Sequence, residues 1–451
     1  MSVRETAEDF APAGKGAEAQ APQSKSIADA AAERQVRRGY QMLACMILLA
    51  ILSQFFRSSN GLIAPNLMAD VSLTSEQIGY LSGAFFIVFA VLQLPVGVLL
   101  DRHGGRNVLS WMLILAVAGS LIFAVGQSYE MLLLGRLLIG IGCAGLMVGS
   151  LVILSRWLPP DRYTFAMALL FAFANVGTFM SSWPLGASTA LWGWRNTFIV
   201  LALMTALFGL LFYWTVRDAP RGHAFHSRKP EPLGETVKGL LEVWRLREVL
   251  LILPMIMIGY AIVQVVLGLW GGPYLYDVYK LNEIARGEVM AFMTLAFIAG
   301  TMAYGPLDRW FNTRKGVVIG GALATIATLL LLAFLPTLAL WQVTLLLCLF
   351  CFVGAFSLVV MSHGLALIPQ RLSGRGVTTL NMGLMGGTAL LQAGTGPFIE
   401  LFSGQAGAAP DAPYRALFGL LAVVVLVATA IYARTQDVRP LENKSGDKKS
   451  G

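Results

Sequence analysis

The sequence predicts an all-α, polytopic membrane protein with twelve transmembrane helices in two pseudo-symmetric six-helix bundles. Three observations carry this prediction: a low charged fraction, twelve long apolar segments and an internal repeat. Of the 451 residues, 56% are hydrophobic and only 13% are charged. Soluble domains carry about 25% charged residues. This chain cannot cover a water-facing surface, so it belongs in a lipid bilayer.

The apolar residues form continuous segments of the length that a spanning helix requires, roughly 20 residues. The stretches 42–52, 80–100 and 198–214 are examples. Barrel strands would instead alternate over about 10 residues, which excludes a membrane β-barrel. Twelve segments are centred near residues 53, 88, 116, 142, 172, 206, 262, 299, 326, 353, 388 and 424.

These segments divide the chain into five parts. We expect a disordered N-terminal tail over 1–39, a six-helix bundle over 40–217, a linker over 218–247, a second bundle over 248–433 and a C-terminal tail over 434–451. The first tail has no apolar core and is not a signal peptide. A basic amphipathic helix is expected over 235–247, along the membrane surface. The loops are too short to fold as domains, so function falls to side chains inside the bundle.

Catalytic and cofactor motifs are not found. The four cysteines lie in predicted spans and imply no disulfide framework, and the pair Cys348 and Cys351 has no Cys or His partner nearby. The spans contain no Ser/His/Asp, zinc or paired-carboxylate arrangement, and the chain has no G-x-x-x-x-G-K-[ST] loop. We therefore expect no enzyme activity, no cofactor and no metal site.

The distribution of Lys and Arg predicts the orientation. With the N-terminus inside, 27 of the 33 fall on inner loops and tails, Arg57 and Arg136 lie within spans, and only Arg195, Lys280, Arg286 and Arg415 lie outside. Both termini are therefore expected in the cytoplasm. The net charge of +8 follows from this asymmetry and from anionic lipids, so nucleic acid is not an expected partner. A monomer in a bacterial inner membrane is expected.

The chain repeats itself with an offset of 207 residues. Asp101-Arg102 after the second segment matches Asp308-Arg309 after the eighth, and Arg57 in the first matches Gln264 in the seventh. Asn175 falls one place from the mate of Asn381. A parallel repeat of two six-helix halves places a binding site between them.

Several motifs resemble those of the major facilitator superfamily. Residues 97–106 are similar to its loop signature G-x-x-x-D-[RK]-x-G, and residues 133–140 to its fourth-helix pattern of an Arg followed by glycines. Gly193-Trp194-Arg195 and Asp308-Arg309 also match what the family shows at those places. The resemblance covers residues 40–433. It departs at Gly105, where a basic residue is usual, and after Asp308-Arg309, where the glycine is missing.

The loop motif suggests a gate on the cytoplasmic side. A carboxylate at a helix end can pair with arginines and with the N-terminus of a neighbouring helix. Such a pair holds one side closed and must break when that side opens. The gate residues proposed are Asp101, Arg102 and Arg106, with Asp308 and Arg309 in the second half. The alternative is a purely topological anchor.

Arg57 is the most informative residue, because it lies about 15 residues into the first span. A charge in hydrocarbon costs at least about 2.5–3.5 kcal/mol on insertion scales, yet no Asp or Glu lies in the middle of any span. Either the side chain snorkels outward, makes a structural hydrogen bond, or meets an anionic substrate in a wet cavity. The position resembles the first-helix Arg with which organic-anion transporters of the superfamily hold a carboxylate or phosphate.

Further substrate contacts are expected around Arg57. Gln264, Tyr260, Trp270 and Tyr274 lie on the seventh helix, whose Gly and Pro residues permit a kink. The alternative for its aromatic residues is an interface belt. Asn175, Asn381 and Gln392 are uncharged polar groups within spans, and the alternative for each is an interhelical hydrogen bond.

Two residues are candidates for coupling to protons. The resemblance links Arg136 to coupling or to helix packing, and His363 is the intramembrane group whose ordinary pKa lies near neutrality. Facilitated diffusion without coupling also stays open.

The sequence therefore favours a secondary transporter that takes up a small organic anion by alternating access. An aromatic substrate moiety would suit Phe55, Phe56, Tyr260 and Trp270. The alternatives are a proton-driven exporter of amphipathic compounds and a non-transporting scaffold. The fifth helix lacks the G-x-x-x-G-P pattern that exporters often resemble, which favours uptake.

Overall fold

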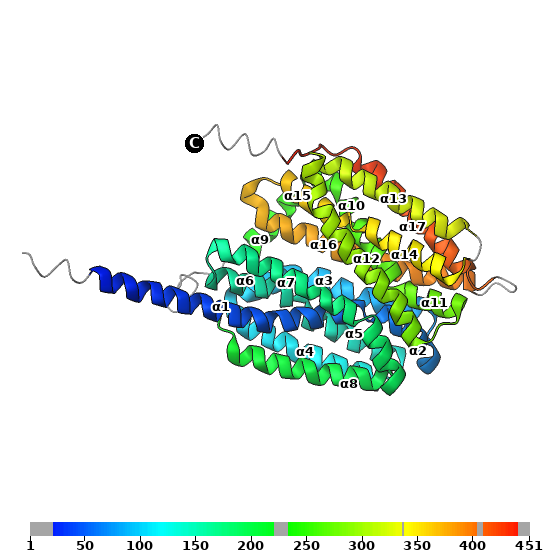
Figure 1. The fold of residues 1–451 in the computed structure, drawn as a ribbon, viewed down its shortest axis with the longest axis horizontal. Helices are drawn as coiled ribbons and strands as arrows, with labels where there is room; N and C mark the ends of the chain where they lie inside the picture. Colours follow the sequence, from blue (N-terminus) through cyan, green and yellow to red (C-terminus); the bar gives the residue numbers. More distant parts are fainter. Residues whose placement is uncertain (1–20, 221–232, 336–337, 404–408, 441–451) are drawn as a thin grey trace, which may run out of the picture.

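The computed structural model describes residues 21–220, 233–335, 338–403 and 409–440 (Figure 1). The secondary structure in this part of the chain is helical. The first half contains α1 (Ala21–Ser58), α2 (Asn60–Val71), α3 (Ser75–His103), α4 (Gly105–Val125), α5 (Tyr129–Ala144), α6 (Leu146–Trp157), α7 (Pro160–Met180) and α8 (Trp183–Thr215).

The short helix α9 (Leu233–Trp244) leads to the second half. That half contains α10 (Arg247–Val265), the π-helix η2 (Val266–Trp270), α11 (Gly271–Tyr279), α12 (Glu283–Trp310), α13 (Arg314–Phe334), α14 (Leu340–Gly354), α15 (Ser357–Leu367), the 3-10 turn η3 (Gln370–Leu372), α16 (Ser373–Ser403) and α17 (Ala412–Tyr432).

Eleven of the described helices or helix pairs are long and apolar enough to span a membrane. The predicted twelfth span corresponds to α16, a helix of 31 residues. It is less apolar because Gly, Thr, Asn and Gln recur along it. With α16, the described residues contain a long helix at each of the twelve predicted positions. Helix α9 lies where the amphipathic linker helix is expected.

Three boundaries differ from the sequence prediction. Residues 21–39 were expected to be disordered but belong to α1, and 1–20 lie outside the described residues. The first membrane helix continues through α2 to Val71, so Arg57 lies near its middle rather than toward its outer end. The fifth membrane helix continues into the first part of α8, as far as Trp192. The kink at Gly193 (φ 78°) separates it from the sixth membrane helix.

Backbone irregularities repeat with the offset seen in the sequence. The first helix breaks at Ser59 and the seventh becomes a π-helix at Val266. The fourth breaks at Gly145 and the tenth at Ala355 and Phe356. Left-handed residues end the first and seventh helices at Ser72 (φ 56°) and Lys280 (φ 55°). These paired features confirm two pseudo-symmetric halves.

Both described chain ends lie on one side of the molecule, next to α6, α9 and α15 (Figure 1). We call this the termini side. Helices α2 and α11 lie on the opposite side, which we call the far side.

The two halves pack backbone to backbone on the far side. A Cβ on Gly272 would lie 1.8 Å from the carbonyl oxygen of Gly61, and a Cβ on Gly79 would lie 2.7 Å from the Cα of Gly396. A Cβ on Gly186 would lie 2.5 Å from the carbonyl oxygen of Glu283. Only glycine allows such close approach. The far side is therefore sealed, and we call these contacts together with the residues that bridge them the far-side seal.

Candidate functional site

Arg57 lies at the end of α1, directly before the helix break. It is half-buried, and its Nε has no hydrogen-bond partner among the described residues. Its guanidinium carbon lies 4.8 Å from the centroid of the Phe89 ring. The described acidic residues lie toward helix ends and loops rather than in mid-membrane. Among the described residues, the Arg57 guanidinium thus contacts the face of a phenyl ring but no carboxylate.

Arg136, on α5, contacts the backbone beside the same helix break. Its side chain is 1% exposed, and its Nη1 donates a 2.9 Å hydrogen bond to the carbonyl oxygen of Phe56. The hydroxyl of Ser59 donates to the same oxygen at 3.2 Å. A helix end leaves carbonyls without intrahelical partners, and these two donors satisfy one. Arg136 therefore does not snorkel to the surface but holds the residue that precedes Arg57.

The second half faces this site with uncharged hydrogen-bonding groups. The Nε2 of Gln264 donates to the Tyr260 hydroxyl at 2.7 Å, and the Nε2 of Gln392 donates to the Gln264 carbonyl at 2.9 Å. The Nε1 of Trp270 donates to Thr395 at 2.9 Å. The carbonyl oxygen of the Gln392 side chain is buried without a partner among the described residues.

A glycine contact brings the repeat mates Arg57 and Gln264 toward each other. Gly61 packs on Gly268, with 2.8 Å between a Cβ on Gly61 and the carbonyl carbon of Gly268. Each glycine lies four residues, or about one helical turn, beyond its polar residue. Near the contact, the Oδ1 of Asn60 is another buried polar atom without a described partner. These groups line the boundary between the halves at mid-membrane depth.

The other predicted substrate contacts lie elsewhere or make local bonds. Tyr274 packs against Tyr279, Tyr414 and Phe418, inside the far-side end of the second half. The Nδ2 of Asn175 donates to the carbonyl of Phe171 in its own helix at 3.0 Å. Asn381 is half-buried on α16. Hydrogen bonds thus connect Tyr260, Gln264 and Gln392, and Arg57 lies one helical turn before the Gly61–Gly268 contact. Tyr274 packs elsewhere.

The far-side seal contains a polar bridge that the sequence did not single out. The Nδ2 of Asn66 donates to Glu283 at 2.9 Å, and Nη2 of Arg286 donates to the Oδ1 of Asn66 at 3.1 Å. Arg286 and Glu283 lie 3.6 Å apart. The distribution of Lys and Arg predicted Arg286 on an outer loop, but its side chain is 1% exposed. Its position three residues after Glu283, which puts both on one helix face, was the available signal.

Two further pairs cross the boundary on the far side. The backbone N–H of Ser75 donates to Glu400 at 2.8 Å, and the hydroxyls of Ser182 and Thr294 lie 3.2 Å apart. Together with the Asn66 bridge, they connect three helix pairs of opposite halves.

The predicted gate residues of the first half make contacts within that half. Asp101 is 64% exposed and lies 3.9 Å from Arg156 on α6. Asp218 accepts a 2.8 Å hydrogen bond from the backbone N–H of Arg106, whose Nε donates to the carbonyl of Tyr213 at 2.9 Å. Arg102 is exposed. A cap on the N-terminus of α4 thus forms as expected, but its carboxylate is Asp218 rather than Asp101.

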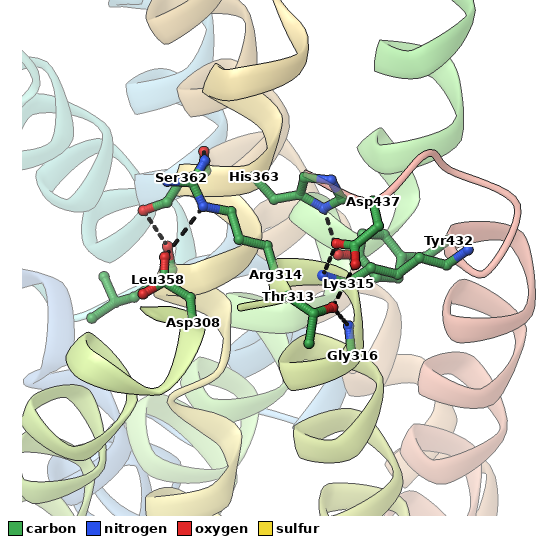
Figure 2. A network of polar contacts seen from close by, with 10 residues as sticks. All are labelled: Asp308, Thr313, Arg314, Lys315, Gly316, Leu358, Ser362, His363, Tyr432 and Asp437. Carbon is green, nitrogen blue, oxygen red and sulfur yellow. Dashed lines mark hydrogen bonds and ion pairs between the residues drawn. The ribbon is translucent and has the colours of Figure 1, made fainter. Parts of the chain in front are cut away.

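The second half repeats this arrangement (Figure 2). Asp308 pairs with Arg314 at 3.2 Å. The positive φ of Gly104 recurs at Asn312 (φ 48°), one residue after the place where the glycine is missing from the motif. Asp437 accepts a 3.0 Å bond from the backbone N–H of Lys315 and a 2.6 Å bond from the Thr313 hydroxyl. Burial raises the pKa of the Asp437 carboxyl, but these hydrogen bonds outweigh it and leave the pKa below its ordinary value.

The C-terminal tail therefore begins as an ordered segment that caps α13, in contrast to its predicted role as a plain tail. Arg309 is exposed beside this cap.

His363 belongs to this cap rather than to the central site. It is fully buried, with Nδ1 2.6 Å from the Tyr432 hydroxyl (Figure 2). Its Nε2 lies 2.9 Å from the Gln436 carbonyl. A neutral ring that donates from Nε2 and accepts at Nδ1 satisfies both bonds. The histidine fastens the C-terminal segment to α15.

The matches to known sequences concern membrane transporters. The sequence model of the Major Facilitator Superfamily matches residues 46–391. A nitrate/nitrite transporter of Picosynechococcus sp. is 26% identical over 298 residues, 56% of this chain and 53% of that one. A probable sulfoacetate transporter of Cupriavidus necator is 24% identical over 192 residues, 43% and 45% of the two chains. The chain therefore spans about half the length of these relatives.

One relative matches along most of the chain. The hexuronate transporter of Escherichia coli K12 is 24% identical over 415 residues, which cover 87% of this chain and 92% of that one.

Solved structures share the fold. A bacterial homologue of the human lysosomal transporter Spinster, in an inward-facing and unoccupied conformation, matches with a TM-score of 0.72 at 20% identity, over 88% of this chain and 96% of that chain. A D-xylose-proton symporter matches with a TM-score of 0.70 at 15% identity, over 88% and 97%.

Proposed function

Because the chain belongs to the Major Facilitator Superfamily, we propose that it is a secondary transporter that carries a small organic or inorganic anion. The observation that carries this proposal is the environment of the Arg57 side chain. Its charge lies at mid-membrane depth, without a carboxylate partner among the described residues and with the face of the Phe89 ring against its guanidinium. An uncompensated charge in hydrocarbon costs at least about 2.5–3.5 kcal/mol, so an anion that enters the site is stabilised there.

The donor set suits a planar group of oxygens. A guanidinium offers several N–H groups in one plane and binds carboxylate-type oxygens in pairs. Across the boundary, Gln264, Tyr260 and Gln392 add uncharged donors and acceptors, which suit hydroxyl groups or further oxygens of the substrate. One accessible cation favours a single negative charge. The proposal agrees with the names of three relatives, which are named for the anions nitrate/nitrite, sulfoacetate and hexuronate.

The far-side seal supports alternating access with the site open toward the termini side. Arg57 is half-buried although the seal lies beyond it, and we propose that its exposed part faces the termini side. From the Lys and Arg distribution we assign this side to the cytoplasm of a bacterial inner membrane. In this assignment the structure faces inward, uptake starts when the far-side seal opens, and a single chain is the transporting unit.

Proton symport is the proposed coupling, with Arg136 as the nearer of the two candidates. Arg136 contacts the backbone next to Arg57, whereas both ring nitrogens of His363 are bonded within the C-terminal cap.

Reconstitution into proteoliposomes tests the function. Uptake of nitrate, sulfoacetate, glucuronate and tartrate is measured with and without an imposed pH gradient. We expect at least one of these anions to be transported and to raise the melting temperature, and Arg57→Gln to lose both effects. Arg245→Gln, at an exposed arginine of the linker, is the matched control. If neutral or cationic compounds alone stabilise the protein, the anion proposal is wrong.

A further inference from the structure

Two guanidinium groups and two phenyl rings form a continuous stack in the first half. The guanidinium carbon of Arg57 lies 4.8 Å from the Phe89 centroid, and that of Arg136 lies 5.3 Å from the Phe85 centroid. The two rings are 5.5 Å apart and tilted by 31°. Phe85 and Phe89 are four residues apart on α3, so one helix face carries both rings. We call these four residues the cation–ring stack.

The stack takes the place that a counter-ion would occupy. The Nε atoms of Arg57 and Arg136 are both buried without a hydrogen-bond partner among the described residues. Ring faces carry partial negative charge and attract a guanidinium, most strongly where water is excluded. The rings themselves are inaccessible, since Phe85 is 0% and Phe89 3% exposed.

Ring faces and carboxylates differ in what they leave for a ligand. A carboxylate would fix Arg57 but would cancel its charge and occupy its N–H groups. A ring fixes the plane of the guanidinium from one face and leaves its full charge and its in-plane N–H edge free. A cation held in this way is pre-organised for an anion, which lowers the entropic cost of binding.

We infer that Phe89, supported by Phe85, is the positioning residue of the anion site, because it holds the Arg57 guanidinium without neutralising it. This inference rests on the proposed anion transport. It also gives Arg136 a role in the site: its bond to the Phe56 carbonyl fixes the backbone next to Arg57, and its guanidinium closes the other end of the stack.

A double-mutant cycle on thermal unfolding tests the stack without any ligand. Phe89→Leu, Arg57→Met and the double variant are compared with the wild type in detergent. We expect Phe89→Leu to lower the melting temperature clearly when Arg57 is present and only slightly in the Arg57→Met background. Phe86→Leu, a buried neighbour on the same helix that contacts Phe85 but no cation, should give the same decrease in both backgrounds. Additive effects of Phe89→Leu and Arg57→Met would overturn the stack.

Titration with sodium nitrate and sodium glucuronate tests the positioning role. Stabilisation by each anion is followed in the wild type, Phe89→Leu, Phe89→Tyr and Phe86→Leu. We expect Phe89→Leu to weaken the apparent affinity roughly 2- to 30-fold, the range of one cation–ring contact. Phe89→Tyr keeps the ring face and should stay within about twofold of the wild type, as should Phe86→Leu.

The outcomes separate the two claims. If the wild type binds an anion and Phe89→Leu binds it equally well, the positioning role is wrong while the transport proposal stands. If neither anion stabilises the wild type and the proteoliposomes also transport no anion, the proposed function fails and the positioning role fails with it. The cation–ring stack itself is then decided by the double-mutant cycle.

Discussion

The side-chain oxygen of Asn66, in the first half, accepts a 3.1 Å hydrogen bond from Arg286, in the second. The amide nitrogen of the same side chain donates to Glu283 at 2.9 Å. One carboxamide thus joins both members of an ion pair across the boundary of the two halves. Glu283 and Arg286 share a helix and move together, so within this bridge it is the bonds to Asn66 that must break when the far side opens.

Removal of the Asn66 side-chain amide should therefore favour the far-side-open state. Hydrogen bonds to charged groups contribute about 1.5–3 kcal/mol each. Loss of both in Asn66→Ala should shift the equilibrium roughly tenfold or more. Distances between spin labels at the exposed positions Ala69 and Lys280 measure this shift. An unchanged distance distribution in Asn66→Ala would show that the bridge does not hold the seal. Asn196→Ala is the matched control, because Asn196 bonds only the carbonyl of Trp192 in its own segment.

The glycine contact between Gly61 and Gly272 gives a second test of the seal. A Cβ at Gly272 would overlap the carbonyl oxygen of Gly61 at 1.8 Å, so the halves cannot close fully in Gly272→Ala. We expect this variant to fold, to rest with its far side open and to lose most transport. Gly320→Ala is the control, since a Cβ there meets no atom within 4 Å. Alanine is the better helix former by about 1 kcal/mol, so this control should be at least as stable as the wild type. Wild-type label distances in Gly272→Ala would contradict the seal.

The Asp437 cap predicts a pH dependence of stability. Its carboxyl has a pKa below the ordinary value, so its contribution is complete above the unfolded-state pKa of about 3.9. It is lost as the pH falls through the lower pKa of the folded state. Asp437→Asn lacks the stabilisation that the ionised Asp437 carboxylate gives to the fold. The difference in stability between the wild type and this variant should therefore shrink as the pH falls through the acid range. Melting temperatures between pH 3 and pH 7 measure it, and a constant difference over that range would refute the cap.

His363 should not carry the transported proton. Its two ring nitrogens bond Tyr432 and Gln436 at the termini side of the second half, away from Arg57. His363→Gln should lower the melting temperature because buried partners lose their bonds, yet uptake should keep the response of the wild type to a pH gradient. If uptake by His363→Gln no longer responds to the pH gradient, His363 takes part in proton coupling and this prediction is wrong.

The sequence was sufficient for the twelve helices and the two halves. Apolar segment length and the offset between Asp101 and Asp308 report directly on these features. It could not reveal the cation–ring stack, because Phe85 and Phe89 resemble any pair of core phenylalanines until α1 and α5 pack against them. The seal was missed for a similar reason. Asn66 and Arg286 are 220 residues apart, and neither residue is unusual before the halves meet.

The carboxylate caps illustrate the same limit. The motif at Asp101 suggested that this residue would cap the next helix, but Asp218, after the sixth helix, does so. Asp437 occupies the corresponding place in the second half. Both lie just after the last helix of their half, where the sequence suggested only linker and tail.

The anion site at Arg57 is tested most directly by anion-dependent stabilisation of Arg57→Gln beside the wild type. The melting temperature of each is measured against increasing sodium nitrate and sodium glucuronate at constant ionic strength. We expect a saturable rise for the wild type with at least one anion and no rise for Arg57→Gln, while Arg245→Gln behaves as the wild type. An equal rise in Arg57→Gln would contradict the anion site.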